Sequence, residues 1–190
     1  EACAGAQYTE ADVFPSAIAQ ASTFDPAIVE QMADIIRRQM LYVGFRQALS
    51  PVMDVDRDPR WGRMTETYGE DAALVSAMSS AFVRGIQSED MKGILATAKH
   101  FAGHGVTEGG INMGRNLVSE RDLLEIHCKP FQCAITEANL KSVMNSYCSI
   151  NGEPVVGSKK MLTEILRNAL GFRGFVVSDY LSLDRLVDPF

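Results

Sequence analysis

The sequence has no hydrophobic run long enough to cross a membrane, and it has few of the residues that build metal sites. Among 190 residues it contains four cysteines, three histidines and one tryptophan. The cysteines form no CxxC pair and no zinc-type spacing with the histidines, and no HExxH motif is present. These absences argue against a membrane-spanning protein and a zinc protein. We expect neither a metal nor another cofactor.

The chain also lacks an excess of positive charge. Its 24 acidic residues outnumber its 18 basic residues, which gives a formal net charge of −6 at pH 7. Because a negative surface repels phosphate groups, we expect neither nucleic acid nor an anionic membrane as a partner. The apolar fraction of 46% is ordinary for a globular domain with a sizeable core.

The sequence has no initiator Met and no cationic, apolar leader. It opens on EACAGAQ and closes on LVDPF, soon after a strand-like segment. We therefore expect it to be part of a longer protein, and bacterial cytoplasm, periplasm and secretion all stay open as its location. The four cysteines are expected to be free thiols, with disulfides as the alternative.

Helix-like and strand-like segments alternate along the chain. Helical apolar spacing and end signals predict helices over residues 24–44, 71–87, 119–138 and 158–171. Short apolar runs predict strands over residues 45–54, 93–101, 141–147 and 174–179. Pro130 predicts a kink or a break inside the third helix. This order favours a parallel sheet with helices packed outside it.

Polar residues gather directly after the predicted strands. They are Asp54 to Arg63, Lys99 and His100, Asn145 to Tyr147, and Asp179. Several strand ends that meet at one polar site are typical of a TIM-type (β/α)8 barrel. A doubly wound dinucleotide fold would need G-x-G-x-x-G between a strand and a helix, and GHGVTEGG lacks that spacing. A whole barrel takes about 250 residues and eight units. We therefore predict that residues 1–190 form an incomplete part of one barrel domain.

Asp179 is the clearest candidate for chemistry. It ends the segment GFVVSD, whose β-branched residues predict a strand buried on both faces. A carboxylate there is costly to desolvate unless it has a partner or a task. Lys99, His100 and Arg63 would surround it with partly cationic groups, and the Tyr147 phenol would help to keep it ionised. This pattern favours a nucleophile that attacks the anomeric carbon of a sugar.

Each of these candidates also has a purely structural interpretation. Lys99 could cap its strand, and the rings of His100 and Tyr147 could pack in the core. The loop 54–71 could be a solvated surface braced by Arg–Asp pairs, although Arg63 and Glu66 are spaced to pair with each other. His104 lies between two glycines and is interpreted as a brace for its loop.

Seven segments, in order, resemble motifs of glycoside hydrolase family 3. They are EACAG, VFPSAIAQASTFDPAIV, SPVMDVDRDPRWGRMTETYGED, AKHFAGHG, SERDLLEIHCKPF, SVMNSYCSING and GFRGFVVSDY. The resemblance covers nearly the whole chain and implies a retaining, exo-acting glycosidase with a TIM-like first domain. We expect release of a terminal β-D-glucosyl residue from a β-linked oligosaccharide or aryl glycoside. The alternatives are a β-xylosidase or α-arabinofuranosidase of the same family, or a non-catalytic sugar-binding barrel.

The resemblance implies a role for each candidate. Asp179 looks like the catalytic nucleophile. Lys99 and His100 look like the pair that binds glycone hydroxyls, and Arg63 looks like the arginine of the WGR segment in the same subsite. Tyr147 looks like the tyrosine beside the nucleophile.

Two further residues take roles at the rim of the site. Glu1 falls where the family usually has an acidic residue that binds outer hydroxyls of the sugar. Ala4, however, departs from the His of EALHG-like segments. Tyr180 falls where many members place a Trp that stacks on the aglycone side.

The resemblance leaves the proton donor outside this sequence. In most of the family the donor is a Glu from a second, α/β sandwich domain. An alternative branch uses an Asp–His dyad, but residues 106–120 contain neither an Asp nor a His. Glu108 and Glu120 are poor substitutes, so we expect residues 1–190 alone to be inactive. A homodimer is left open.

Overall fold

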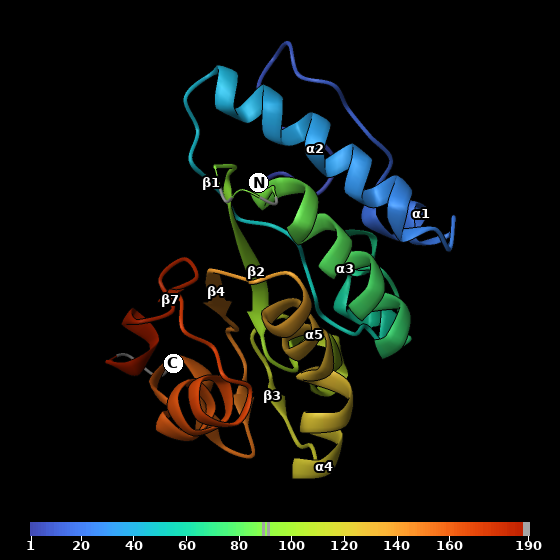
Figure 1. The fold of residues 1–190 in the computed structure, drawn as a ribbon. Coiled ribbons are helices and arrows are strands. Elements are labelled where there is room, and N and C mark those ends of the chain that lie inside the picture. The colour runs from blue at the N-terminus through green and yellow to red at the C-terminus, as the bar shows by residue number, and fades with distance from the viewer. Residues whose placement is uncertain (89, 91, 188–190) are drawn as a thin grey trace.

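The computed structural model describes residues 1–88, 90 and 92–187. Within these residues, four strands form a fully parallel sheet in the order β1–β2–β4–β7. They span Gln47–Ala48 (β1), Leu95–Phe101 (β2), Ser142–Asn145 (β4) and Phe175–Val177 (β7). Helical segments separate consecutive strands, as the alternating pattern predicted (Figure 1).

A second, smaller sheet was not predicted. It consists of β3 (Arg115–Asn116), β5 (Ser149–Ile150) and β6 (Glu153–Pro154), in which β3 pairs parallel and β6 antiparallel with β5. It lies beyond the carboxyl end of β2 (Figure 1). The Asn116 amide donates to the Gly103 carbonyl at 2.8 Å, which ties this sheet to the loop that follows β2.

Helices α2 and α3 each begin after an aspartate that caps the helix. The Asp25 carboxylate accepts from the Ala27 N–H at the start of α2, and Asp71 caps α3 by accepting from the Leu74 N–H. Helix α3 packs against α2 and α5 on one side of the sheet (Figure 1). The α-helices are α1 (Ala17–Ala21), α2 (Pro26–Tyr42), α3 (Ala72–Gln87), α4 (Glu120–Asp122) and α5 (Lys129–Glu137). The remaining helical segments are π-helices at Leu123–His127 and Lys160–Ala169 and 3₁₀ turns at Pro59–Trp61, Met64–Glu66, His104–Val106, Glu108–Gly110, Val155–Gly157 and Asp184–Leu186.

The predicted break in the third helix is confirmed. Ser119 caps α4 by accepting from the Asp122 N–H, a π-helical turn follows, and α5 starts at Lys129. Pro130 lies in the first turn of α5, where its missing N–H leaves no intrahelical bond unmade.

The predicted strand over residues 45–54 is shorter than expected. Only Gln47–Ala48 is a strand, and Val52 then makes an isolated bridge with Lys99. The segment still runs beside β2, because the Met53 N–H donates to the Lys99 carbonyl.

The prediction that β7 is buried on both faces is wrong. Phe175 is 44% exposed, and Val176 and Val177 are only partly buried. Among the described strands, β7 lies at the end of the sheet and pairs with β4 alone, so one of its edges is uncovered.

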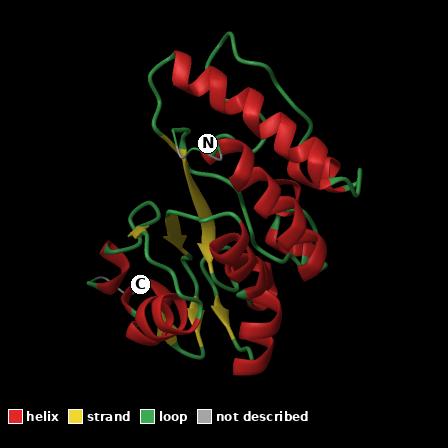
Figure 2. Cartoon of the chain, viewed as in Figure 1, coloured by secondary structure: helices red, strands yellow, loops and turns green. Residues whose placement is uncertain are grey.

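The described strands do not close into a barrel, since β1 and β7 are the two outer strands of the sheet. The fold is α/β with a mostly parallel sheet and helices packed on it, as the colouring of Figure 2 shows. Between sheet and helices lies one apolar core, in which the rings of Phe101 and Phe131 meet edge to face at 5.1 Å.

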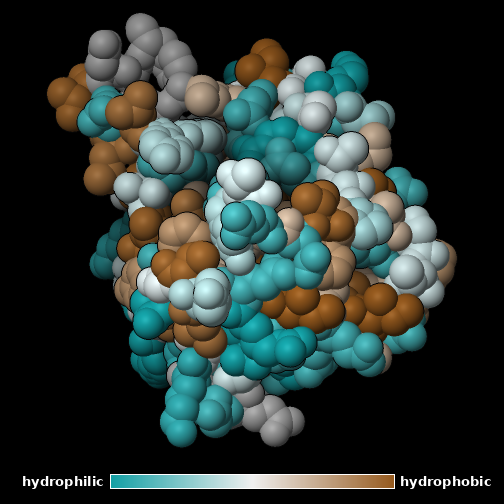
Figure 3. Space-filling view, turned by 90° about the horizontal axis from the view of Figure 1, so that it is seen from above, coloured by the Kyte–Doolittle hydropathy of each residue, from teal (hydrophilic) through white to brown (hydrophobic). Residues whose placement is uncertain are grey.

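The surface carries apolar patches among polar side chains, as Figure 3 shows for the face seen from above. In the described part of the chain, no helix has the length and apolar character that crossing a membrane would require.

Candidate active site

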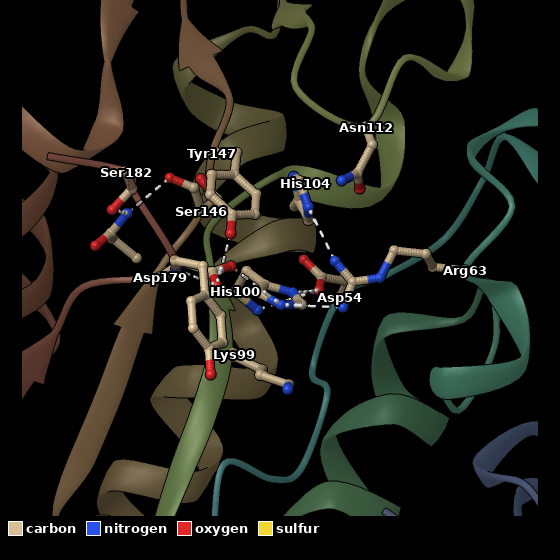
Figure 4. A network of polar contacts seen from close by, with 12 residues as sticks. Asp54, Arg63, Lys99, His100, His104, Asn112, Ser146, Tyr147, Asp179 and Ser182 are labelled. Carbon is tan, nitrogen blue, oxygen red and sulfur yellow. Dashed lines mark hydrogen bonds and ion pairs between the residues drawn. The ribbon is translucent and has the colours of Figure 1, made fainter. Parts of the chain in front are cut away.

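The polar residues that follow the strands meet at the carboxyl edge of the main sheet (Figure 4). Lys99 and His100 come from the end of β2. Tyr147 follows β4, and Asp179 follows β7. The parallel strands all present their carboxyl ends at this edge, which brings together residues that are distant in the sequence.

Asp179 lies at the centre of this cluster and is 8% exposed. Its Oδ1 accepts hydrogen bonds from the Tyr147 hydroxyl at 3.0 Å and from the Tyr180 backbone N–H at 2.7 Å. Its Oδ2 lies 3.7 Å from His100 Nε2. One oxygen is therefore held by two donors, and the other faces the imidazole.

His100 is a buried imidazole that pairs with Asp54. Its Nδ1 lies 2.7 Å from Asp54 Oδ2, and its backbone N–H donates to the same oxygen at 3.1 Å. Burial, followed by the nearby charges of Arg63 and Lys99, lowers the pKa of His100 well below the ordinary value. Burial likewise raises the pKa of the Asp54 carboxyl, although His104 and Arg63 act against this rise.

Arg63 connects its own loop to the imidazole. Its Nε and Nη2 donate to the two oxygens of Glu66 at 2.8 and 2.9 Å, and Nη2 also lies 3.3 Å from His100 Nε2. The guanidinium carbon lies 5.4 Å from the centre of the Trp61 ring. The Trp61 N–H in turn donates to Asn112 Oδ1 at 2.9 Å, which fixes the ring. The expected pairing of Arg63 with Glu66 is confirmed.

His104 packs inside this cluster. Its ring centre lies 5.1 Å from that of Trp61 and 4.8 Å from that of His100, and its Nε2 lies 3.5 Å from Arg63 Nη1. Burial, reinforced by His100, lowers the pKa of His104 to about 3. A neutral ring in this position suits the bracing role expected from the sequence.

Lys99 extends the site on the other side of His100. The peptide bond between the two residues is cis, and both side chains lie at the same edge of the sheet. The Lys99 side chain is 3% exposed, and its ammonium group donates to Glu1 Oε1. The first residue of the chain is thus brought to the predicted site.

Residues 2–190 match the family described as Glycosyl hydrolase family 3 N terminal domain. The chain belongs to glycoside hydrolase family 3. The resemblance predicted from the ordered motifs is therefore confirmed.

Relatives of this family 3 chain include glycosidases from bacteria and fungi. It is 41% identical over 185 residues to a β-xylosidase from Formosa agariphila. The aligned region covers 94% of this chain and 26% of that protein. It is 35% identical over 178 residues to a probable β-glucosidase C from Aspergillus flavus, and the aligned region covers 88% of this chain and 28% of that protein. The fold is similar to that of a β-glucosidase from Erythrobacter marinus, with a TM-score of 0.96 and 34% identity over 99% of this chain and 26% of that one. The family 3 chain thus spans 26–28% of the length of these proteins.

Tyr180, Glu108 and Glu120 lie outside the buried cluster around Asp179. Tyr180 contacts Asp179 through its backbone N–H, and its side chain is 82% exposed. The two weak acid/base candidates each pair with a cation on exposed surface, Glu108 with Arg115 and Glu120 with Lys160.

Metal-binding clusters and reactive thiols are two other kinds of site to consider among the described residues. Within the described residues, no group of three or more His, Cys, Asp or Glu side chains could hold a metal ion. All four cysteines are free thiols, as expected, and burial raises the pKa values of Cys128 and Cys148 to about 12. Neutral thiols of this kind are poor nucleophiles.

Sequence reasoning did not single out Asp54, which is the nearest acidic partner of His100. A signal was present, because Asp54 ends an apolar run as Asp179 does. The pairing depends on the bridge between Val52 and Lys99, which sets this segment beside β2.

Proposed function

We propose that this chain supplies the nucleophile and the glycone-binding residues of a retaining, exo-acting glycoside hydrolase that releases a terminal β-D-glucosyl residue. The observation that carries the proposal is the position of Asp179. Its carboxylate follows β7 with two donors on Oδ1 and the His100 imidazole near Oδ2, and Lys99 and Arg63 belong to the same cluster (Figure 4). The glycosidase names of the relatives support the reaction class.

In this mechanism, Asp179 attacks the anomeric carbon while the glycosidic C–O bond breaks. A carboxylic acid protonates the leaving oxygen, and water then hydrolyses the glycosyl-enzyme ester, which restores Asp179. The Tyr147 hydroxyl and the Tyr180 N–H hold Oδ1 of the nucleophile in place, because both donate to it. Arg63, Lys99 and His100 bind the glycone hydroxyls.

The rim residues complete the proposed sugar site. Glu1 binds the outer hydroxyls of the glycone from its position beside Lys99. The exposed ring of Tyr180 stacks on the aglycone side. The substrate is a β-linked oligosaccharide or aryl glycoside, and no cofactor takes part.

The proton donor comes from elsewhere in the full-length protein. A retaining enzyme needs a second carboxyl about 5–5.5 Å from the first. We assign this role to a Glu of a second, α/β sandwich domain. The remaining strands of a (β/α)8 barrel would complete the first domain. Residues 1–190 expressed alone should therefore show no turnover above a vector control, whereas the full-length protein should be active.

A second candidate is β-xylosidase activity, because the relative from Formosa agariphila with 41% identity carries that name. Glucose differs from xylose by a hydroxymethyl group at C6. The relative kcat/KM values of the full-length protein for 4-nitrophenyl β-glucoside and β-xyloside would separate the two. An α-arabinofuranosidase and a non-catalytic sugar-binding barrel are the further alternatives.

Covalent trapping tests the nucleophile. The full-length protein would be incubated with a 2-fluoro β-glucoside inactivator, and the modified peptide would be mapped by mass spectrometry. We expect the label on Asp179 and none on an Asp179→Asn variant. Absence of label with the glucoside and also with the matching β-xyloside would contradict the nucleophile assignment and favour the binding barrel.

A further inference from the structure

Both hydrogen bonds that the structure describes for the Asp54 carboxyl are with His100. Its side chain is fully buried, and Oδ2 accepts both from the His100 ring at 2.7 Å and from the His100 backbone at 3.1 Å. Within the described residues its Oδ1 has no hydrogen-bond partner. A buried carboxyl that serves only His100 has its effect through His100.

The contact with Arg63 determines which ring nitrogen of His100 carries the proton. A guanidinium group has N–H donors and no acceptor, so His100 Nε2 must offer a lone pair to Arg63 Nη2 at 3.3 Å. Because Nε2 acts as an acceptor and carries no proton, the ring proton is on Nδ1 and points at Asp54. The two contacts therefore specify the same tautomer from opposite sides of the ring.

A purely structural role for the Asp54 carboxyl is less well supported. The backbone around it is already held, because the Met53 N–H donates to the Lys99 carbonyl at 2.6 Å and the Asp56 N–H donates to the Gly69 carbonyl at 3.2 Å. These bonds hold the segment beside β2 in addition to the bond between the His100 N–H and Asp54 Oδ2.

We propose that Asp54 is a positioning residue for sugar recognition, which holds His100 as the Nδ1–H tautomer so that Nε2 accepts a hydrogen bond from a glycone hydroxyl. The hydroxyl part of this inference rests on the proposed function. His100 Nε2 lies between Arg63 and Asp179 Oδ2, at 3.3 and 3.7 Å. A hydroxyl that enters there replaces the Arg63–His100 contact: it accepts from Arg63 and donates to the Nε2 lone pair. With the opposite tautomer, two donors would face each other.

Nitrogen-15 spectra of the full-length protein, labelled on histidine, test the tautomer directly. His100 is assigned by comparison with a His100→Gln variant. We expect the wild-type ring to be protonated on Nδ1 and bare on Nε2 between pH 5 and 8. A ring protonated on Nε2, or on both nitrogens, would overturn the proposal whether or not an Asp54 variant folds.

Asp54→Leu removes the acceptor while it keeps the branching of the side chain, and Asp56→Leu is the matched control. Asp56 is also buried and lies two residues away, but its observed hydrogen bond is to the Asp58 N–H. We expect Asp54→Leu to lose the Nδ1–H tautomer and to lower kcat/KM for 4-nitrophenyl β-glucoside about 10- to 100-fold, as for other partners that orient a histidine. Asp56→Leu should keep the tautomer.

The outcomes separate this inference from the proposed function. An unchanged tautomer in a folded Asp54→Leu protein would refute the positioning role. If the tautomer changes as expected but the wild-type protein neither hydrolyses nor is labelled by a glycoside, the proposed function fails. The positioning of His100 by Asp54 then stands, without the sugar hydroxyl.

Discussion

At the scale of single residues, Arg63 joins several parts of the candidate site, since it contacts Glu66, His100 and His104. Burial acts to raise the pKa of Glu66, but the hydrogen bonds and charge of Arg63 outweigh it and lower this pKa below the ordinary value. Glu66 is thus ionised near neutral pH and holds the guanidinium through two parallel bonds. The remaining N–H groups of Arg63 are thereby aimed at His100 and His104.

Arg63→Lys should impair turnover although it keeps the charge, because an ammonium group cannot make the two fixed bonds to Glu66 and also reach His100. A hydrogen bond to a charged group contributes about 1.5–3 kcal/mol, so we expect kcat/KM to fall roughly 10- to 100-fold. Steady-state kinetics of the full-length protein would measure this. Arg60→Lys is the control, since Arg60 lies in the same loop and pairs with Asp58 on the surface. Equal effects of the two substitutions would contradict the assigned role.

At the scale of elements, the approach of β7 to β4 positions Asp179. The Phe175 N–H donates to the Lys141 carbonyl at 3.1 Å, and Gly174 lies directly before that bond. A Cβ on Gly174 would lie 2.0 Å from the Lys141 oxygen, which is backbone and has little room to move. Glycine is required here by close packing and not by its backbone angles.

Gly174→Ala should therefore displace β7 and Asp179, the proposed nucleophile that follows it. We expect a loss of stability of about 1–3 kcal/mol, typical of overpacking, together with reduced kcat. Urea unfolding and steady-state kinetics of the full-length protein would measure the two effects. The comparison is Gly171→Asn, because a Cβ there meets nothing within 4 Å and Asn tolerates its φ of +75°. If Gly174→Ala were as stable and as active as Gly171→Asn, the assigned packing would be wrong.

At the scale of the whole molecule, buried ionisable groups couple stability to pH. Burial lowers the pKa of His127 to about 4, although Asp54 acts to raise it. When the folded pKa of a histidine lies below the unfolded value of about 6.5, the unfolded chain binds more protons between these two values. Stability therefore falls as the pH drops through this window. The buried carboxyls of Asp54 and Asp56, whose pKa values are raised by burial, act in the opposite direction.

Replacement of His127 by Gln isolates the histidine contribution. Between pH 6.5 and 5, we expect wild-type protein to lose about 1–2 kcal/mol more unfolding free energy than the variant, at most about 1.4 kcal/mol per pH unit. Urea unfolding at several pH values would give both slopes. Cys128→Ala, a change at the adjacent buried residue, should keep the wild-type slope. Parallel slopes for wild type and His127→Gln would show that His127 is not buried in its neutral form.

Much of the secondary structure was predictable, because its signals are local. The caps at Asp25 and Asp71 and the break at Pro130 act within a few residues. The small sheet of β3, β5 and β6 was missed because its strands are two residues long and carry no alternating pattern. The exposure of β7 was missed because an apolar run specifies a strand and does not specify which neighbours cover it.

The sequence by itself determined the parallel α/β pattern, the ordered family 3 motifs and the residue types for sugar chemistry. Tertiary structure brings the site residues together, because the contacting pairs are distant in the sequence. Asp54 and His100 lie 46 residues apart, and Lys99 and Glu1 lie 98 residues apart. Only the packed sheet decides such contacts, because they require parallel strands to end at one common edge. The tautomer of His100 and the pairing of Arg63 with both Glu66 and His100 follow from that packing.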